Sequence, residues 1–243
     1  MGAPFSDITL YTPSPHKVGT PEFIAEASLQ NFVSDLYVQK MYGYKPPKTS
    51  RITIQPAYHD IWDRTWKTGS IVAIAPYYSY DEYASLNKTG KYKYILDLIQ
   101  GATLQLSDEY HWDKTVFEKA YNEVIESDFV FKIDYPTKIS RDKKKVANLC
   151  IEKTETVTSV YVNIEINGTT IKAKLLDKEN IWWYDCVYFL SRRNKWLDKN
   201  KFGISYDKGK IEIWYSIEDN EVGLFEDGNR VIEIDFKKYF LFG

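Results

Sequence analysis

The chain of 243 residues has 32 Lys and Arg against 34 Asp and Glu, and 44% of its residues are hydrophobic. This composition is typical of a globular protein with one large or two small domains. The formal charge of −2 disfavours the broad basic footprint that non-specific nucleic-acid binding needs. Two Cys are too few for a disulfide framework, and no apolar run approaches the roughly 20 residues that cross a bilayer. With no signal-peptide pattern at the N-terminus, we expect a cytosolic protein without a membrane segment.

Helical signals dominate the N-terminal half. The first twenty residues contain several Pro, so we expect them to be extended or loosely ordered. A helix then begins after Thr20, whose side chain can cap it; Pro21 suits the first helical position, and Gly43 ends the apolar period. Apolar residues at helical spacing predict an antiparallel pair of helices within 94–106 and 116–124. Two short strands are expected within 51–55 and 70–75.

From Phe129 onward the pattern changes from helical to alternating. The strongest signal is Val157–Ile166 followed by Asn167-Gly168, because Asn-Gly tolerates the positive φ angles of a type I′ hairpin turn. The second strand of this hairpin covers 169–176. Further strands are expected at 147–153, 181–190, 203–206, 210–217, 222–226 and 230–236. Short turns between consecutive strands favour an antiparallel meander.

The predicted fold class is therefore α+β. A helical N-terminal portion, residues 1–136, packs on a C-terminal antiparallel β-meander sheet, residues 146–243. The polar segment between them, 136–145, is the expected junction. Because the helices could equally cover one face of a single sheet, the sequence leaves open whether the portions are one domain or two.

The last expected strand carries a candidate motif of metal-dependent nucleases. Glu233, Asp235 and Lys237 would share one strand face, since side chains alternate along a strand. Two carboxylates can bind a divalent cation while a lysine positions or activates water. The competing interpretation is that these charges mark a solvated face, and the charged fraction of 27% favours it.

Other catalytic or metal-binding patterns are weak. His59, Asp60 and Asp63 could supply metal ligands, with His111 and Asp113 as distant partners, but no second close His or Cys pair supports a metal centre. A structural or surface role is favoured for them. The chain also lacks a Gly-x-Ser-x-Gly nucleophile motif and a P-loop. We therefore expect neither a metal nor a cofactor.

Charged segments define the expected binding surface. One basic segment runs from Arg141 to Lys145, and the other surrounds Trp196 with Arg192, Arg193, Lys195, Lys199 and Lys201. Basic side chains around an aromatic ring are typical of proteins that bind single-stranded nucleic acids. The favoured interpretation is a solvated loop whose Trp docks on the sheet. Carboxylates follow at Glu218, Asp219, Glu221, Glu226 and Asp227. Basic and acidic rims together suit a specific protein partner better than a polyanion.

Aromatic residues are abundant: 20 Tyr, 12 Phe and 7 Trp contrast with 3 His and 2 Cys. Such a chain is rich in groups that pack and poor in groups that usually catalyse, although an AT-rich coding sequence would also produce this excess. Trp182 and Trp183 are adjacent in an expected strand, so their rings must point to opposite faces. An exposed ring suits an interface or a sugar-stacking platform, whereas a sheet covered on both sides would bury both.

These observations favour a non-catalytic cytosolic protein that binds one protein partner, as a toxin-neutralising immunity protein does. Nucleic acid is not the expected partner. The binding residues that we expect are Trp182, Trp183, Trp196, Arg192, Arg193, Glu218 and Asp219. The alternatives are a metal-dependent nuclease using Glu233, Asp235 and Lys237, and a carbohydrate-binding module using Trp182 and Trp183.

Overall fold

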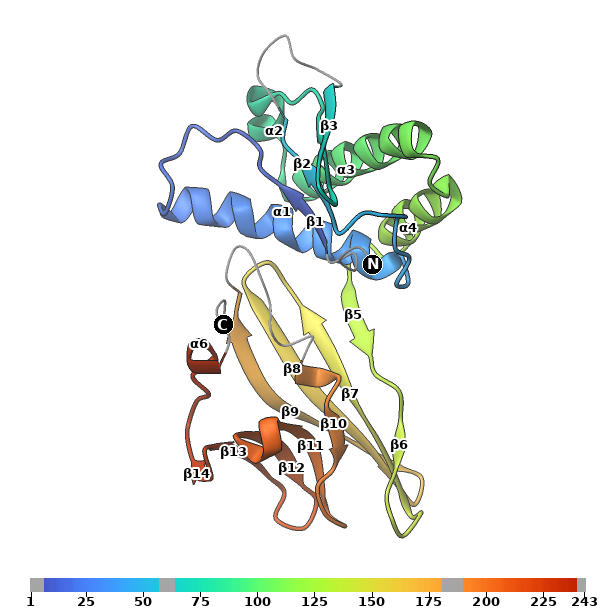
Figure 1. The fold of residues 1–243 in the computed structure, drawn as a ribbon. Helices are drawn as coiled ribbons and strands as arrows, with labels where there is room; N and C mark the ends of the chain where they lie inside the picture. Colours follow the sequence, from blue (N-terminus) through green and yellow to red (C-terminus); the bar gives the residue numbers. More distant parts are fainter. Residues whose placement is uncertain (1–6, 57–63, 181–189, 240–243) are drawn as a thin grey trace. The chain divides into compact units, whose positions relative to one another are not determined.

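A computed structural model describes residues 7–56, 64–180 and 190–239, apart from the side chains of residues 237 and 239. The chain divides into two compact units, Met1–Val130 (the N-terminal unit) and Phe131–Gly243 (the C-terminal unit) (Figure 1). Helices are mostly in the first and antiparallel sheets in the second, so the predicted α+β class is confirmed. The status of the two portions as separate domains stays a prediction.

A four-stranded mixed sheet lies in the N-terminal unit. Its strands are β1 (Asp7–Leu10), β2 (Arg51–Ile54), β3 (Arg64–Thr68) and β4 (Ile71–Ala75), in the order β1-β2-β4-β3. Strands β1, β2 and β4 are parallel, and β3 is antiparallel to β4. The two predicted strands are confirmed as β2 and β4. The first twenty residues were expected to be extended or loosely ordered; Asp7–Leu10 is extended, and its pairing with β2 as a strand was not predicted.

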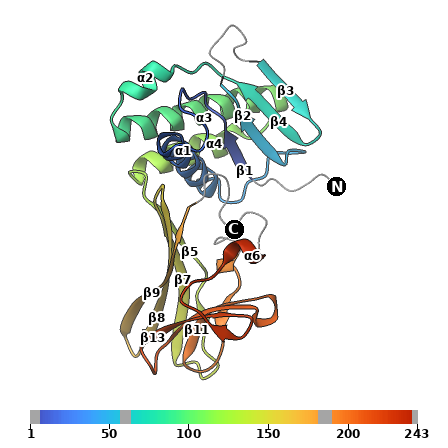
Figure 2. The same cartoon turned by 90° about the vertical axis from the view of Figure 1, so that its left-hand side faces the viewer.

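The helices of this unit gather beside the sheet (Figure 2). They are α1 (Pro21–Lys40), α2 (Tyr80–Ser85), α3 (Lys88–Tyr110) and α4 (Lys114–Glu126). The predicted start of the first helix is confirmed, since the Phe23 N–H donates to Thr20 Oγ1. The predicted helical pair is α3 and α4, which pack on each other and on α1. Among the described residues, no helix is both long and apolar enough to cross a membrane.

Tyr37 ties these three helices together. Its side chain is fully buried in α1, and its hydroxyl donates to Gln100 Oε1 of α3 at 2.7 Å. The same oxygen lies 3.0 Å from Thr103 Oγ1 and 3.2 Å from the Phe117 carbonyl of α4. Burial raises the pKa of Tyr37, so the hydroxyl keeps its proton for these bonds. The core of this unit therefore depends on a satisfied polar group as well as on apolar packing.

Two antiparallel sheets form the C-terminal unit, where the sequence predicted one meander. The first contains β5 (Phe131–Asp134), β7 (Lys145–Lys153), β8 (Val157–Ile166) and β9 (Thr169–Glu179) in that order, with β6 (Lys138–Ile139) paired to β7. The second contains β10 (Asn194–Trp196), β11 (Lys201–Tyr206), β12 (Ile211–Ser216), β13 (Glu221–Glu226) and β14 (Asn229–Arg230), and the 3-10 turn Asp207–Gly209 joins β11 to β12. Apolar residues of both sheets share one buried core, so the sheets face each other.

Local turn chemistry sets the pairing within these sheets. Asn167 and Gly168 have φ angles of 49° and 80°, and the predicted hairpin of β8 and β9 is confirmed. The predicted strand 230–236 is wrong beyond Arg230, because the chain bends there and enters the short helix α6 (Phe236–Tyr239). The predicted junction 136–145 belongs to the C-terminal unit, since it contains β6. The predicted strand 181–190 lies almost entirely outside the described residues.

Gly203 marks a close approach between two strands of the second sheet. A Cβ atom at this position would lie 2.0 Å from the Ile213 carbonyl oxygen and 2.6 Å from Trp214 Cα. Both are backbone atoms of β12, so a side chain could be accommodated only by separating the strands. The pairing of β11 and β12 thus requires glycine here.

Candidate functional site

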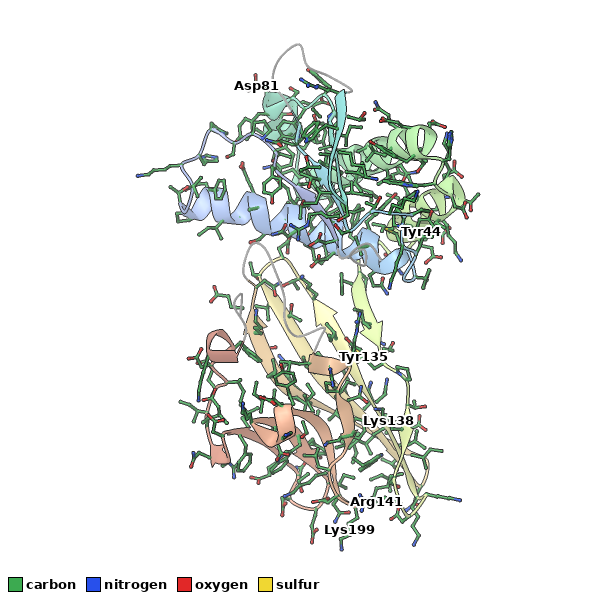
Figure 3. The ribbon with its side chains drawn as sticks, in the orientation of Figure 1. Tyr44, Asp81, Tyr135, Lys138, Arg141 and Lys199 are labelled. Atoms are coloured by element: carbon green, nitrogen blue, oxygen red, sulfur yellow. The ribbon has the colours of Figure 1, made fainter. Side chains whose placement is uncertain are left out.

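Four turns gather at one end of the C-terminal unit, which we call the turn end. They are residues 140–144 before β7, 167–168 before β9, 197–200 before β11 and 217–220 before β13. Strand pairing requires this arrangement, because Lys145 lies opposite Ile166 and Lys201 lies opposite Ser216. Figure 3 shows Arg141 and Lys199, from the first and third of these turns, at the same end of the unit.

Three hydrogen bonds join residues 138–145, which contain the first predicted basic segment, to the second basic segment around Trp196. The Trp196 indole N–H donates to the Lys138 carbonyl at 2.9 Å, and the Lys138 ammonium donates to the Asn194 carbonyl at 2.5 Å. The Lys145 ammonium donates to the Lys199 carbonyl at 2.8 Å. Segments about fifty residues apart in the sequence therefore form one continuous surface.

Trp196 is a half-buried anchor of this surface. Its ring meets Phe202 edge to face at a centroid distance of 5.2 Å, and its only N–H is bound to the Lys138 carbonyl. A ring held in this way cannot swing out to stack on a base. The structure thus places Trp196 against its own sheet, which is the arrangement that the sequence favoured over a nucleic-acid platform.

Carboxylates in the two basic turns stabilise the turns themselves. Asp142 accepts from the Ser140 hydroxyl at 2.5 Å and from the Lys144 N–H at 3.1 Å. The Ser140 hydroxyl, the Lys144 N–H and the Lys145 ammonium lower the pKa of Asp142 to about 2. Asp198 Oδ1 accepts from the backbone N–H groups of the next turn residues, 200 and 201. Both acids are therefore held as acceptors within the fold.

The predicted acidic binding residues, Glu218 and Asp219, also accept hydrogen bonds from nearby polar groups of the C-terminal unit. Glu218 Oε2 accepts from the Asn200 amide at 2.8 Å, which links the third and fourth turns. Asp219 Oδ2 accepts from the Ser216 hydroxyl at 2.7 Å. Both carboxylates lie in the turn end and are exposed, so the structure brings them beside the basic segments.

The exposed basic side chains of the turn end, unlike the carboxylates, do not stabilise the turns. Within the part of the chain that the structure describes, their side chains have no hydrogen-bonding or ion-pair partner in the molecule. They are Arg141, Lys143, Lys144 and Lys199, together with Lys195 of the adjoining strand β10. The side chains able to reach toward another molecule are therefore cationic, while the neighbouring acids are fixed by the turns. Such an arrangement can attract and orient an acidic surface.

The remaining predicted binding residues are partly outside the described residues. Arg192 and Arg193 are exposed, and the Arg193 N–H donates to the Leu190 carbonyl at 2.8 Å. They precede β10, whereas the turn 197–200 follows it, so these two members of the basic segment do not lie in the turn end. Trp182 and Trp183 lie outside the described residues, as do His59, Asp60 and Asp63.

The strand on which the nuclease alternative was predicted does not extend to its residues. Glu233 and Asp235 are exposed on a segment that is not a strand, so they do not share a strand face. The side chain of Lys237 lies outside the described residues. Asp113 caps α4 by accepting from the Thr115 N–H, and His111 ends α3 in a left-handed conformation. Over residues 7–56, 64–180 and 190–239, no group of three or more His, Cys, Asp or Glu could hold a metal ion.

Comparison of this chain with models of protein families, with curated proteins and with solved structures finds no match.

Proposed function

We propose that this chain binds an acidic surface of a protein partner through the turn end, and that it does so without transforming the partner. The supporting observation is that three hydrogen bonds join residues 138–145 to the basic segment around Trp196, with Arg141, Lys143 and Lys199 exposed on the joined surface. The hydrogen bonds between the turns fix the backbone from which the bases extend, so less conformational entropy is lost when a partner docks.

A protein suits this surface better than a nucleic acid. Asp142, Asp198, Glu218 and Asp219 lie among the bases and would repel a run of phosphates. A folded protein can place its own donors against these acids and its carboxylates against the bases. The indole of Trp196 is committed to Phe202 and Lys138, so it offers no stacking platform for bases. A cytosolic immunity-type protein that neutralises a toxin by covering it is the form of binding that we propose.

Charge reversal in both segments tests this proposal. We expect Lys143→Glu and Lys199→Glu each to weaken binding of a partner captured from native lysate by roughly tenfold, mainly through slower association at low salt. Lys208→Glu is the matched control, because Lys208 is an exposed base in the turn that joins β11 to β12 at the opposite end of the second sheet. A partner that binds all three variants equally, or a captured nucleic acid, would contradict the proposal.

The two alternative functions, carbohydrate binding and metal-dependent nuclease activity, can each be tested separately. The carbohydrate-binding module depends on Trp182 and Trp183, and Trp fluorescence across a panel of glycans would reveal it. The nuclease is tested by nucleic-acid degradation with Mg²⁺ or Mn²⁺, in which identical behaviour of the wild type and Asp235→Ala would exclude it.

A further inference from the structure

The turn between β8 and β9 carries a dipeptide that can react with itself. Asn167 is the one Asn of the chain that is followed by Gly. The two residues form the tip of the hairpin, because Ile166 and Thr169 on either side of them are paired. The backbone nitrogen that follows an Asn can attack its side-chain amide. Gly hinders this attack least, because it has no Cβ and its backbone rotates most freely.

Both groups that the reaction needs are free. Residues 167–170 are exposed. Among the described residues, the Asn167 side-chain amide has no hydrogen-bonding partner, and neither has the Gly168 backbone N–H. A Cβ atom built on Gly168 would meet nothing within 4 Å, so open space surrounds this residue. The attacking nitrogen and the amide therefore have no hydrogen bond to break before they meet.

Asn220 provides a comparison within the same unit. It is exposed in a turn, and its φ of 51° is close to the 49° of Asn167. However, its Oδ1 accepts from the Tyr215 hydroxyl at 2.7 Å, and Glu221 follows it. This hydrogen bond fixes the amide, whereas the amide of Asn167 can rotate toward the next backbone nitrogen.

A second turn has the same backbone geometry but a held side chain. Asp227 and Gly228 connect β13 to β14 with φ angles of 48° and 80°, nearly those of the β8–β9 turn. The Asp227 carboxylate accepts from the Lys238 ammonium at 2.6 Å, and its backbone N–H donates to the Lys210 carbonyl at 2.8 Å. A carboxylate is also a poorer target for a nucleophile than a neutral amide. The two turns are therefore not equally reactive.

The position of Asn167 allows the reaction in the folded chain. Attack requires its side chain and the following peptide group to rotate toward each other. Because Ile166 and Thr169 are the last paired residues, this rotation opens the exposed tip and leaves the buried face of β8 in place. Local opening of an exposed turn costs far less free energy than global unfolding.

We propose that Asn167 deamidates spontaneously in the folded protein. The Gly168 nitrogen forms a bond to Cγ of Asn167, the Cγ–Nδ2 bond breaks, and ammonia leaves with the proton of the Gly168 N–H. Water then opens the resulting succinimide. Opening at Cγ gives Asp, and opening at the backbone carbonyl gives isoaspartate, in which the main chain runs through Cγ. The reaction consumes water and needs neither an oxidant nor a reductant.

Either product changes the turn end. A carboxylate replaces a neutral amide next to the turn 140–144, because Lys145 lies opposite Ile166. Isoaspartate also lengthens the main chain in a turn where both residues have positive φ angles. The reaction does not depend on whether the turn end binds a partner, so this proposal and the proposed function can fail separately.

Peptide mapping by mass spectrometry tests this proposal. The full chain is incubated in a warm, mildly alkaline buffer made with water labelled with heavy oxygen, and samples are digested under acidic conditions that stop the reaction. We expect the peptide containing Asn167 to gain labelled oxygen and to separate into Asp and isoaspartate forms. Conversion should be about tenfold or more faster than at Asn220. It should accelerate as the pH rises, because the attacking nitrogen must lose its proton.

A variant and an unfolded sample locate the reaction. Asn167→Gln keeps an amide but adds a methylene group, which disfavours ring closure, so conversion at this position should fall by about tenfold or more. A sample in urea gives the rate without the turn. Absence of conversion in native buffer, including conversion confined to the urea sample, would overturn the proposal. So would an equal rate at Asn220, an unchanged rate in Asn167→Gln, or Asp without isoaspartate, which indicates direct hydrolysis of the amide.

Discussion

Hydroxyl-bearing rings are buried in the N-terminal unit, whereas the C-terminal unit buries mainly aliphatic side chains between its two sheets. Tyr37, Tyr78 and Tyr83 are almost fully buried in the first unit. The shared core of the second is built from the aliphatic residues of β7, β8, β11 and β12, with Phe202 and Tyr215. The C-terminal unit also gathers exposed bases at its turn end. The first core therefore has to satisfy buried hydroxyls such as that of Tyr37, whereas the second depends mainly on apolar packing.

The largest expected effect is on the packing of the C-terminal unit. Gly203→Ala places a methyl group 2.0 Å from the Ile213 carbonyl oxygen, and the backbone of β12 cannot yield without breaking the sheet. We expect the free energy of unfolding to fall by about 3 kcal/mol or more. Urea unfolding followed by circular dichroism measures it. Gly101→Ala is the control, since a methyl group there meets nothing within 4 Å and should stabilise α3 by about 0.5–1 kcal/mol. Equal stability of the two variants would contradict the close approach.

A smaller effect is expected from the buried hydroxyl of the N-terminal unit. Tyr37→Phe removes the donor to Gln100 and leaves the Phe117 carbonyl with one fewer neighbour. Because the groups left behind are buried, we expect a loss of about 1–3 kcal/mol in urea unfolding. Tyr11→Phe removes the hydroxyl of a ring that is 54% exposed and should change stability little. If the two variants are equally stable, the hydroxyl network contributes nothing.

The smallest effect is the acid dependence of the turn end. The pKa of Asp142 is lowered to about 2 in the folded chain, below the roughly 3.9 of an unperturbed Asp. Its contribution to stability is therefore present above about pH 4 and is lost as the pH falls through about 2. We expect Asp142→Asn to reduce the difference in unfolding free energy between pH 5 and pH 2. An NMR titration giving Asp142 an ordinary pKa would contradict the turn geometry.

Features with a local cause could be predicted from the sequence. Thr20, Pro21 and Gly43 mark the limits of α1, and Asn167-Gly168 sets the β8–β9 hairpin, because each signal acts within a few residues. β1 could not be predicted in this way. Its four residues alternate polar and apolar, but four residues are too short a run to predict a strand beside several Pro, and the strand depends on β2, 44 residues away, for its hydrogen bonds.

Alternation misled the prediction at the C-terminal end. Ile232 and Ile234 would lie on one face of a strand, yet the first is 99% exposed and the second 4%. The last backbone hydrogen bond to β13 is donated by Val231, and the chain bends at the next residues, so the expected strand face does not form.

Long-range contacts also define the turn end. Both basic segments were visible in the sequence, but their union depends on Trp196 meeting Lys138. The two-residue strand β6 that carries Lys138 is too short to leave a pattern.

Hydrogen–deuterium exchange of the chain, alone and with its captured partner, tests the turn end most directly. We predict that binding slows exchange in residues 138–145 and 194–201 together and leaves the turn at Asp207–Gly209 unchanged. Slower exchange confined to the N-terminal unit, or to the opposite end of the second sheet, would contradict the account.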